Sequence, residues 1–236
     1  MAMTRLEDFM SKDEIAQSRM PEEYISWFEG KLNIIKQRRE ELKQQNILHQ
    51  GVSKYFHEEL FPLYRLLQNK LEDWEQAKFL PVIGGQNYDV KVNTNRSDVP
   101  QYIEITITDR DEEQHNRMEY FLKHGEVDLL GAVSISRKPI RKIQVEGGLL
   151  DERKINQGQK NRIQESIVKK TKVVKRMEGT ALLVYFDDYT YFRYDRPESK
   201  QEMGLFLASI NTEWQKQYTQ LYVVGASGKS FWQVNS

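Results

Sequence analysis

The stretch Thr180-Ala181-Leu182-Leu183-Val184-Tyr185-Phe186 is a near-continuous apolar run. A strand that other elements cover on both faces has this composition, whereas a strand with one solvated face alternates apolar and polar residues. Helical patterns over 157–177 and 200–218 precede and follow the run. We therefore expect residues 180–186 to form a central strand of an α/β protein, in which helices flank a mixed sheet.

Further elements extend from this strand toward both ends of the chain. Short apolar or alternating runs predict strands over 79–83, 87–92, 102–107, 127–136, 140–145, 221–224 and 231–234. Apolar residues at three- and four-residue spacing predict helices over 11–45, 51–76 and 111–124. The composition changes near Lys78, and the sequence thus predicts a helical N-terminal extension (1–50) and an α/β domain (51–236) that together form one compact unit.

Composition narrows the class of protein. The 236 residues include no cysteine, which excludes disulfides and thiolate zinc sites. No stretch approaches the roughly 20 apolar residues of a membrane helix, and residues 1–10 hold no apolar run of the signal-peptide kind. We therefore expect a soluble, cytoplasmic protein without a membrane partner.

Two predicted strands each contain one carboxylate in an apolar or aromatic setting, namely Asp89 in 87–92 and Glu104 in 102–107. Burying an unpaired charge costs several kcal/mol, and a divalent cation is one way to compensate it. The polar link 93–100 suits two neighbouring antiparallel strands. One interpretation is that both carboxylates hold Mg²⁺, and the other is that Asp89 lies near a turn while Glu104 pairs with an Arg or Lys.

The order of these elements, with Asp89 before Glu104-Ile105-Thr106, resembles the PD-(D/E)XK nuclease superfamily over roughly residues 51–186, with 109–156 as an insertion. That family places an Asp at the start of one strand and Glu-x-Lys on the next. The resemblance implies a restriction-endonuclease-like core, Mg²⁺ held by Asp89 and Glu104, and hydrolysis of phosphodiesters. Thr106 stands where the family has its Lys.

A lysine from elsewhere must replace Thr106 if the protein is a nuclease, because a neutral hydroxyl does not stabilise developing negative charge as an ammonium does. Lys91 follows Asp89 by two residues and therefore points to the same side of its strand. Lys169 or Lys170 could reach the site from the predicted helix 157–177, with Ile163 and Ile167 packing that helix on the sheet. We favour Lys170 as the catalytic lysine.

The segment 137–176 contains thirteen Lys or Arg and four Asp or Glu, although the net charge of the chain is zero. Such a segment suits the phosphate backbone of a nucleic acid, but it also suits a solvated face. The candidate nucleic-acid-binding side chains are Lys169, Lys170, Lys172, Lys175 and Arg162. A non-catalytic module that binds nucleic acid or protein through this segment is the alternative function, and self-association through the N-terminal helices is a third.

Two other motifs each lack a required residue. Gly225-Ala226-Ser227-Gly228-Lys229-Ser230 resembles a phosphate loop, but Val223 occupies the position of the first glycine and a strand follows. This stretch is predicted to be a hairpin turn. His57-Glu58-Glu59-Leu60-Phe61 begins like a zinc-protease helix, but it has Phe61 in place of the second histidine.

Overall fold

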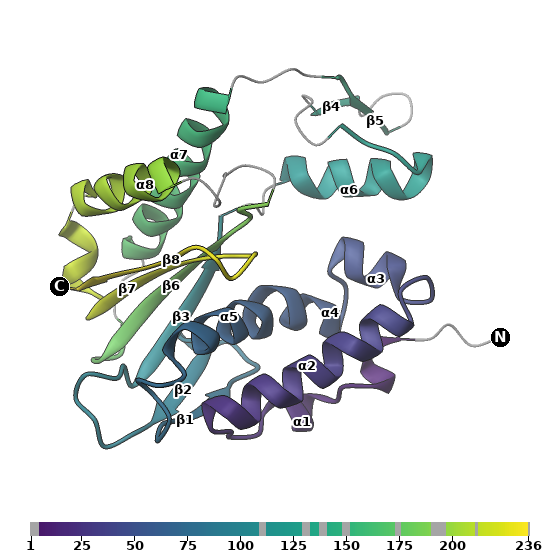
Figure 1. The fold of residues 1–236 in the computed structure, drawn as a ribbon. Coiled ribbons are helices and arrows are strands. Elements are labelled where there is room, and N and C mark those ends of the chain that lie inside the picture. The colour runs from purple at the N-terminus through teal and green to yellow at the C-terminus, as the bar shows by residue number, and fades with distance from the viewer. Residues whose placement is uncertain are drawn as a thin grey trace.

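A six-stranded mixed sheet forms the centre of the computed structural model, which describes residues 5–108, 112–128, 133–136, 141–147, 152–172, 176–189, 197–210 and 212–235. The strand order is β1-β2-β3-β6-β7-β8 (Figure 1). The strands are β1 (Lys78–Pro81), β2 (Val90–Asn93), β3 (Tyr102–Ile107), β6 (Thr180–Phe186), β7 (Gln220–Gly225) and β8 (Phe231–Asn235). Neighbours β3, β6 and β7 run parallel, and the other neighbouring pairs run antiparallel.

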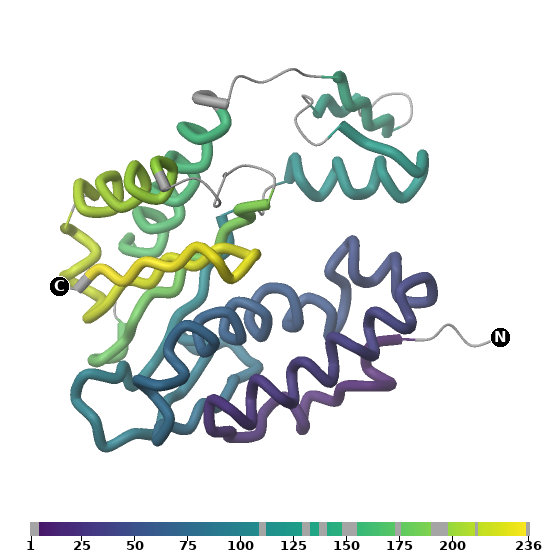
Figure 2. Tube along the Cα trace, in the orientation of Figure 1, coloured from purple at the N-terminus to yellow at the C-terminus, as the bar shows by residue number. Residues whose placement is uncertain are grey.

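Helices cover both faces of this sheet, as Figures 1 and 2 show, so the predicted α/β architecture is confirmed. One face packs on α2 and α5, and the other face packs on α7 and α8. The helices are α1 (Lys12–Ile15), α2 (Pro21–Gln37), α3 (Lys43–Leu48), α4 (Val52–Tyr55), α5 (Phe61–Lys70), α6 (Glu112–His124), α7 (Glu152–Thr171) and α8 (Pro197–Ser209). No helix in the described ranges is both long enough and apolar enough to cross a membrane.

Strand β6 is buried along its whole length between β3 and β7, which confirms the central strand predicted from its apolar run. Its side chains alternate between the two faces. Leu183 belongs to the α2/α5 core, whereas Leu182 and Val184 belong to the α7/α8 core. The absence of alternation in the sequence therefore reflects two cores that meet at one strand.

Truncating Leu183 to alanine is expected to lower the free energy of unfolding by about 2–5 kcal/mol, because the side chain is fully buried and leaves a cavity. Urea denaturation followed by circular dichroism measures the loss. Leu205→Ala is the matched control, since Leu205 is 66% exposed and its truncation should cost little. A loss under about 1 kcal/mol for Leu183→Ala would contradict the two-sided packing.

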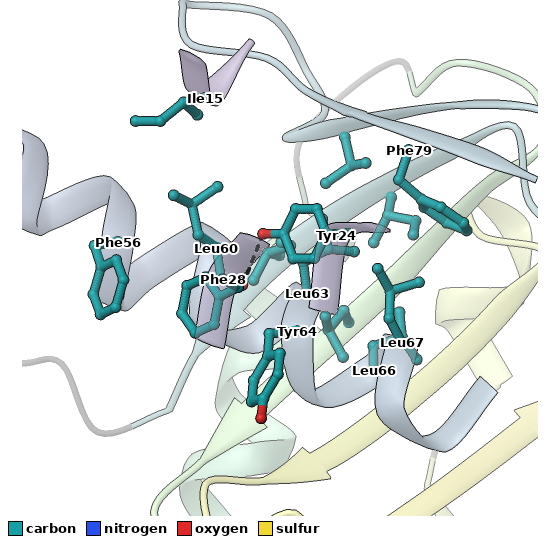
Figure 3. Packing of buried hydrophobic residues seen from close by; sticks show 14 of the residues in the cluster. Ile15, Tyr24, Phe28, Phe56, Leu60, Leu63, Tyr64, Leu66, Leu67 and Phe79 are labelled. Carbon is teal, nitrogen blue, oxygen red and sulfur yellow. Dashed lines mark hydrogen bonds between the residues drawn. The ribbon is translucent and has the colours of Figure 1, made fainter. Parts of the chain in front are cut away.

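The prediction of one helix over 11–45 is wrong, because this region is divided into α1, α2 and α3. The break before α2 has a long-range cause: Arg19 exchanges two backbone hydrogen bonds with Phe79 of β1, at 3.0 and 2.8 Å. This pairing holds the backbone extended, and Pro21 then starts α2. Tyr24 and Phe28 anchor α2 in the core, where the Tyr24 hydroxyl donates to the Leu60 carbonyl at 3.0 Å (Figure 3).

The helix predicted over 51–76 runs from 52 to 70 and contains a π-helical turn, Phe56–Leu60, between α4 and α5. In this turn the Phe61 amide donates to the Phe56 carbonyl, five residues back. Pro62 follows at once. Because proline has no N–H, Pro62 cannot form the α-helical hydrogen bond to the residue four positions back, and the helix is widened directly before it.

Residues between β3 and α7 include α6 and a small separate sheet of β4 (Val133–Ser136) and β5 (Lys142–Val145). The two strands pair antiparallel, as predicted, although β4 is shorter than the expected 127–136. The expected turn at 137–139 lies outside the described residues. Helix α6 lies opposite α3 (Figure 1), where the Lys43 ammonium is 5.8 Å from the centre of the Phe121 ring.

Candidate functional site

Asp89 lies in the bend immediately before β2, so the strand predicted over 87–92 begins three residues later than expected. Strands β2 and β3 are antiparallel neighbours, as predicted. The Asp89 amide donates to the Ile103 carbonyl at 2.9 Å, and the Asp89 Oδ2 accepts from the Ile105 amide at 2.6 Å. These two bonds hold Asp89 across from Glu104, which lies between Ile103 and Ile105 on β3.

Glu104 is only 5% exposed and has three polar partners. Its Oε1 accepts from the Lys170 Nζ at 2.7 Å. Its Oε2 lies 3.0 Å from the Arg176 Nε and accepts from the Tyr218 hydroxyl at 2.5 Å. Two cations therefore compensate the buried charge, which matches the interpretation in which Glu104 pairs with an Arg or Lys.

Helix α7 brings Lys170 to Glu104. Ile163 and Ile167 are buried against the face of the sheet formed by β6 and β7, and Lys170 lies three residues further along the same helical face. The packing of two isoleucines thus determines where the ammonium lies. Lys91, the other candidate, is exposed on β2, opposite Tyr102 of β3.

The remaining basic candidates lie in different surroundings. Lys169 and Lys172 are exposed, and the Arg162 guanidinium is half-buried and donates to the Gln159 Oε1 at 3.1 Å. Lys175 lies outside the described residues. Because Lys170 and Arg176 are directed at Glu104, the cations of the segment 137–176 do not all face the solvent.

Glu59 is a third carboxylate of this region, and the sequence did not single it out. It lies half-buried on the π-helical turn. Burial, and next the charge of Asp89, raise its pKa to about 8, while Lys54 and Lys170 partly offset the shift. Its signal in the sequence was an acid three residues after Phe56, on the apolar face of a predicted helix.

The pKa of Asp89 is also raised. Burial raises its pKa, and the charge of Glu104 adds to the rise, whereas the Ile105 amide, Lys170 and Arg176 lower it. Two acids with raised pKa values mark a place where added positive charge would be stabilising. The positive charge of Lys170 lowers the pKa of both acids.

A divalent cation fits the chemistry of this donor set, because hard cations prefer carboxylate oxygens. Asp89 and Glu104 would hold it, and Glu59 lies near enough for the charge of Asp89 to raise its pKa. The three present partners of Glu104 occupy one position on Oε1 and two on Oε2, so a cation would bind at the remaining position of Oε1 or displace a partner. In the described part of the chain, no group of three or more His, Asp or Glu side chains has a metal-holding arrangement.

Glu59→Gln is expected to remove a loss of stability that the parent protein undergoes between about pH 4.5 and pH 8. In that window the unfolded chain releases the Glu59 proton and the folded chain retains it, so stability falls as the pH rises. At about 1.4 kcal/mol per pKa unit and with partial exposure, the variant should be more stable than the parent by about 2–4 kcal/mol at pH 8, and nearly equal at pH 4.5. Urea denaturation at the two pH values measures this, and a difference that does not change with pH would contradict it.

No model of a known protein family matches the chain, and neither a curated protein nor a solved structure matches it.

Proposed function

We propose that this protein is a metal-dependent phosphodiesterase that cleaves nucleic acid. The observation that carries the proposal is the Lys170 ammonium, 2.7 Å from Glu104 and electrostatically coupled to Asp89. It supplies from α7 the positive charge that Thr106 cannot supply from β3. The chain order α5, three antiparallel strands, α7 and then β6 parallel to β3 supports a restriction-endonuclease-like core.

In this proposal each side chain has a separate task. Asp89 and Glu104 hold Mg²⁺, and the bound ion would polarise a phosphoryl oxygen and lower the pKa of a water molecule. Lys170 donates hydrogen bonds to the attacking water or to a phosphate oxygen. Tyr218 and Arg176 keep the Glu104 carboxylate oriented, and burial together with Glu104 raises the pKa of Tyr218, so that it remains a neutral donor.

The test is cleavage of a panel of single- and double-stranded DNA and RNA with Mg²⁺ or Mn²⁺, by the parent protein and by Asp89→Ala. Cleavage is expected in the parent and not in the variant. Asp98→Ala is the control, because Asp98 is an exposed acid in the link between β2 and β3. Cleavage that survives Asp89→Ala would show that the activity arises elsewhere.

A non-catalytic module that binds nucleic acid or protein is the second candidate. The observation in its favour is that both oxygens of Glu104 already have partners, as in a structural ion pair. In this case the outward lysines of α7 would hold the phosphate backbone. Self-association through the N-terminal helices and a cytoplasmic location stay predictions.

Replacing Lys169 and Lys172 together by alanine is expected to weaken nucleic-acid binding and to lower the slope of log affinity against log salt by about 1–2, because each lost phosphate contact removes about 0.9. Fluorescence anisotropy with a labelled oligonucleotide at several salt concentrations measures the slope. Both lysines are exposed, so the fold should be unaffected. An unchanged slope would place the nucleic acid on another face.

A further inference from the structure

A cavity of about 710 Å³ opens at the carboxyl ends of the parallel strands. Ile107 ends β3 there, and Tyr185 and Asp187 lie at the end of β6. One wall comes from α3 and from the helix that contains the π-helical turn, and the other comes from α6. Ligands of open α/β sheets bind outside the carboxyl ends of strands, and the volume lies in the range of small-molecule sites.

Flat rings form much of the cavity wall. His49 and His57 stack with their ring centres 4.4 Å apart and an interplanar angle of 20°. Phe61 and Tyr185 meet edge to face at 6.0 Å. Tyr189 also lines the cavity and is 62% exposed, so a planar ligand in the cavity can reach its ring. A planar aromatic ligand suits such walls, because it can stack on several of these rings.

The polar groups of the cavity complement these rings. Lys54 supplies a positive charge, and Asp187 supplies a carboxylate. Asn46 and Gln114 line the cavity from α3 and α6, and each carries an NH2 donor group. Their amide oxygens accept within the protein, from the Ser53 hydroxyl at 3.1 Å and from the Arg117 guanidinium at 2.7 Å. Amides of this kind suit the hydrogen-bonding edge of a heterocycle, and the ammonium suits an anionic substituent such as a phosphate.

The cavity and the carboxylate site share the helix that contains the π-helical turn. His57 lines it from the π-helical turn that holds Glu59 two residues later. Lys54 lines it too, and its charge lowers the pKa of Glu59. Neither Glu59 nor Asp89 lines the cavity, so Lys54 is the group that connects it with the carboxylates.

We propose that this cavity binds a nucleotide, with the base between the aromatic walls and the phosphate at Lys54. The base could belong to a bound nucleic acid from which it has left the stack, and that part of the inference rests on the proposed function. That the cavity recognises a nucleotide does not rest on the proposed function, because it follows from the residues of the cavity walls. An extruded base and a free nucleotide share this chemistry, so the source is decided by experiment.

The experiment is isothermal titration calorimetry of the metal-free, full-length protein with the 5′-monophosphates of adenosine, guanosine, cytidine and uridine. At least one should bind with a Kd below about 1 mM, and ribose 5-phosphate at least about tenfold more weakly, because it cannot stack. Tyr189→Ala should weaken nucleotide binding by about 5- to 150-fold, the range of one stacking contact. Lys54→Ala should weaken the binding of the nucleotide more than the binding of the matching nucleoside, because the nucleoside lacks the phosphate.

Tyr120→Ala and Lys12→Ala are the matched controls, since neither residue lines the cavity. They should bind nucleotides as the parent does. The proposal is overturned if no monophosphate binds at about 10 mM, if ribose 5-phosphate binds as tightly as the nucleotides, or if Tyr189→Ala and His57→Ala, both shown to be folded, bind as the parent does.

Two further measurements distinguish nucleotide binding by the cavity from cleavage at the carboxylate site. Asp89→Ala should retain nucleotide binding. A parent protein that binds nucleotides and cleaves nothing supports the cavity and contradicts the phosphodiesterase. A protein that cleaves but binds no nucleotide does the reverse. If an oligonucleotide competes with the nucleotide, and the competition is lost when its bases are replaced by abasic sites, the cavity binds a base of nucleic acid. If the nucleotide binds and no oligonucleotide competes, the cavity binds a free nucleotide.

Discussion

Lys170→Ala is expected to lower metal-dependent cleavage by about 10²- to 10³-fold, the usual effect of removing one group that stabilises developing charge. The ammonium lies 2.7 Å from Glu104 and acts on the charges of both Asp89 and Glu59. Among the described candidate lysines, Lys170 is the one in contact with Glu104, and its loss removes that contact. Initial rates at saturating Mg²⁺ measure the effect, in protein shown to be folded.

Lys169→Ala is the matched control for this variant, because it removes the same charge one residue away, from an exposed side chain. At a saturating concentration of nucleic acid it should cleave at nearly the parent rate, because its expected effect is on binding. Lys91→Ala completes the set. Full activity in both Lys170→Ala and Lys91→Ala would mean that the site lies elsewhere, and absence of cleavage by the parent with any divalent metal would leave the non-catalytic module.

Arg176→Ala is expected to lower the free energy of unfolding by about 3–5 kcal/mol, because it leaves the buried Glu104 charge with one cation fewer. The side chains of Arg176 and Glu104 are 4% and 7% exposed. The Arg176 Nε also donates to the Tyr218 hydroxyl at 3.0 Å, so the truncation disturbs that bond as well. Urea denaturation measures the loss.

Lys216→Ala is the control for this ion pair, since Lys216 and Glu213 are 70% and 58% exposed. Such a pair contributes about 0–1 kcal/mol. Combining Arg176→Ala with Glu104→Gln should cost less than the sum of the two single changes, because the uncompensated charge is then gone. A loss below about 1 kcal/mol for Arg176→Ala, or strict additivity, would mean that solvent already screens Glu104.

Local sequence patterns were sufficient where the local residues determine the structure. Strands β3 and β6 have the boundaries expected from their runs. The stretch 225–230 forms the predicted turn between β7 and β8. The contact of Lys170 with Glu104 was within reach of sequence reasoning, because Ile163, Ile167 and Lys170 share a helical face.

Long-range contacts were outside that reach. Tyr218 meets Glu104 across 114 positions of the chain, and no periodicity connects the two. The pairing of Arg19 with Phe79 interrupts the stretch 11–45, for which the sequence pattern predicts one continuous helix. Glu59 escapes sequence reasoning for a different reason: an acid within a helical pattern is normally solvated, whereas burial and the charge of Asp89 make this one unusual.

The π-helical turn holds one residue more than an α-helix would need to connect α4 to α5. Deleting one residue between 56 and 60 would let the helix close regularly and would leave α4 and α5 near their present register, because the wide turn absorbs the extra residue locally. His57 and Glu59 lie in the turn itself, and their side chains would lose their present directions. A homologue with a single-residue gap at this place would therefore keep the helix and lose the geometry of the turn.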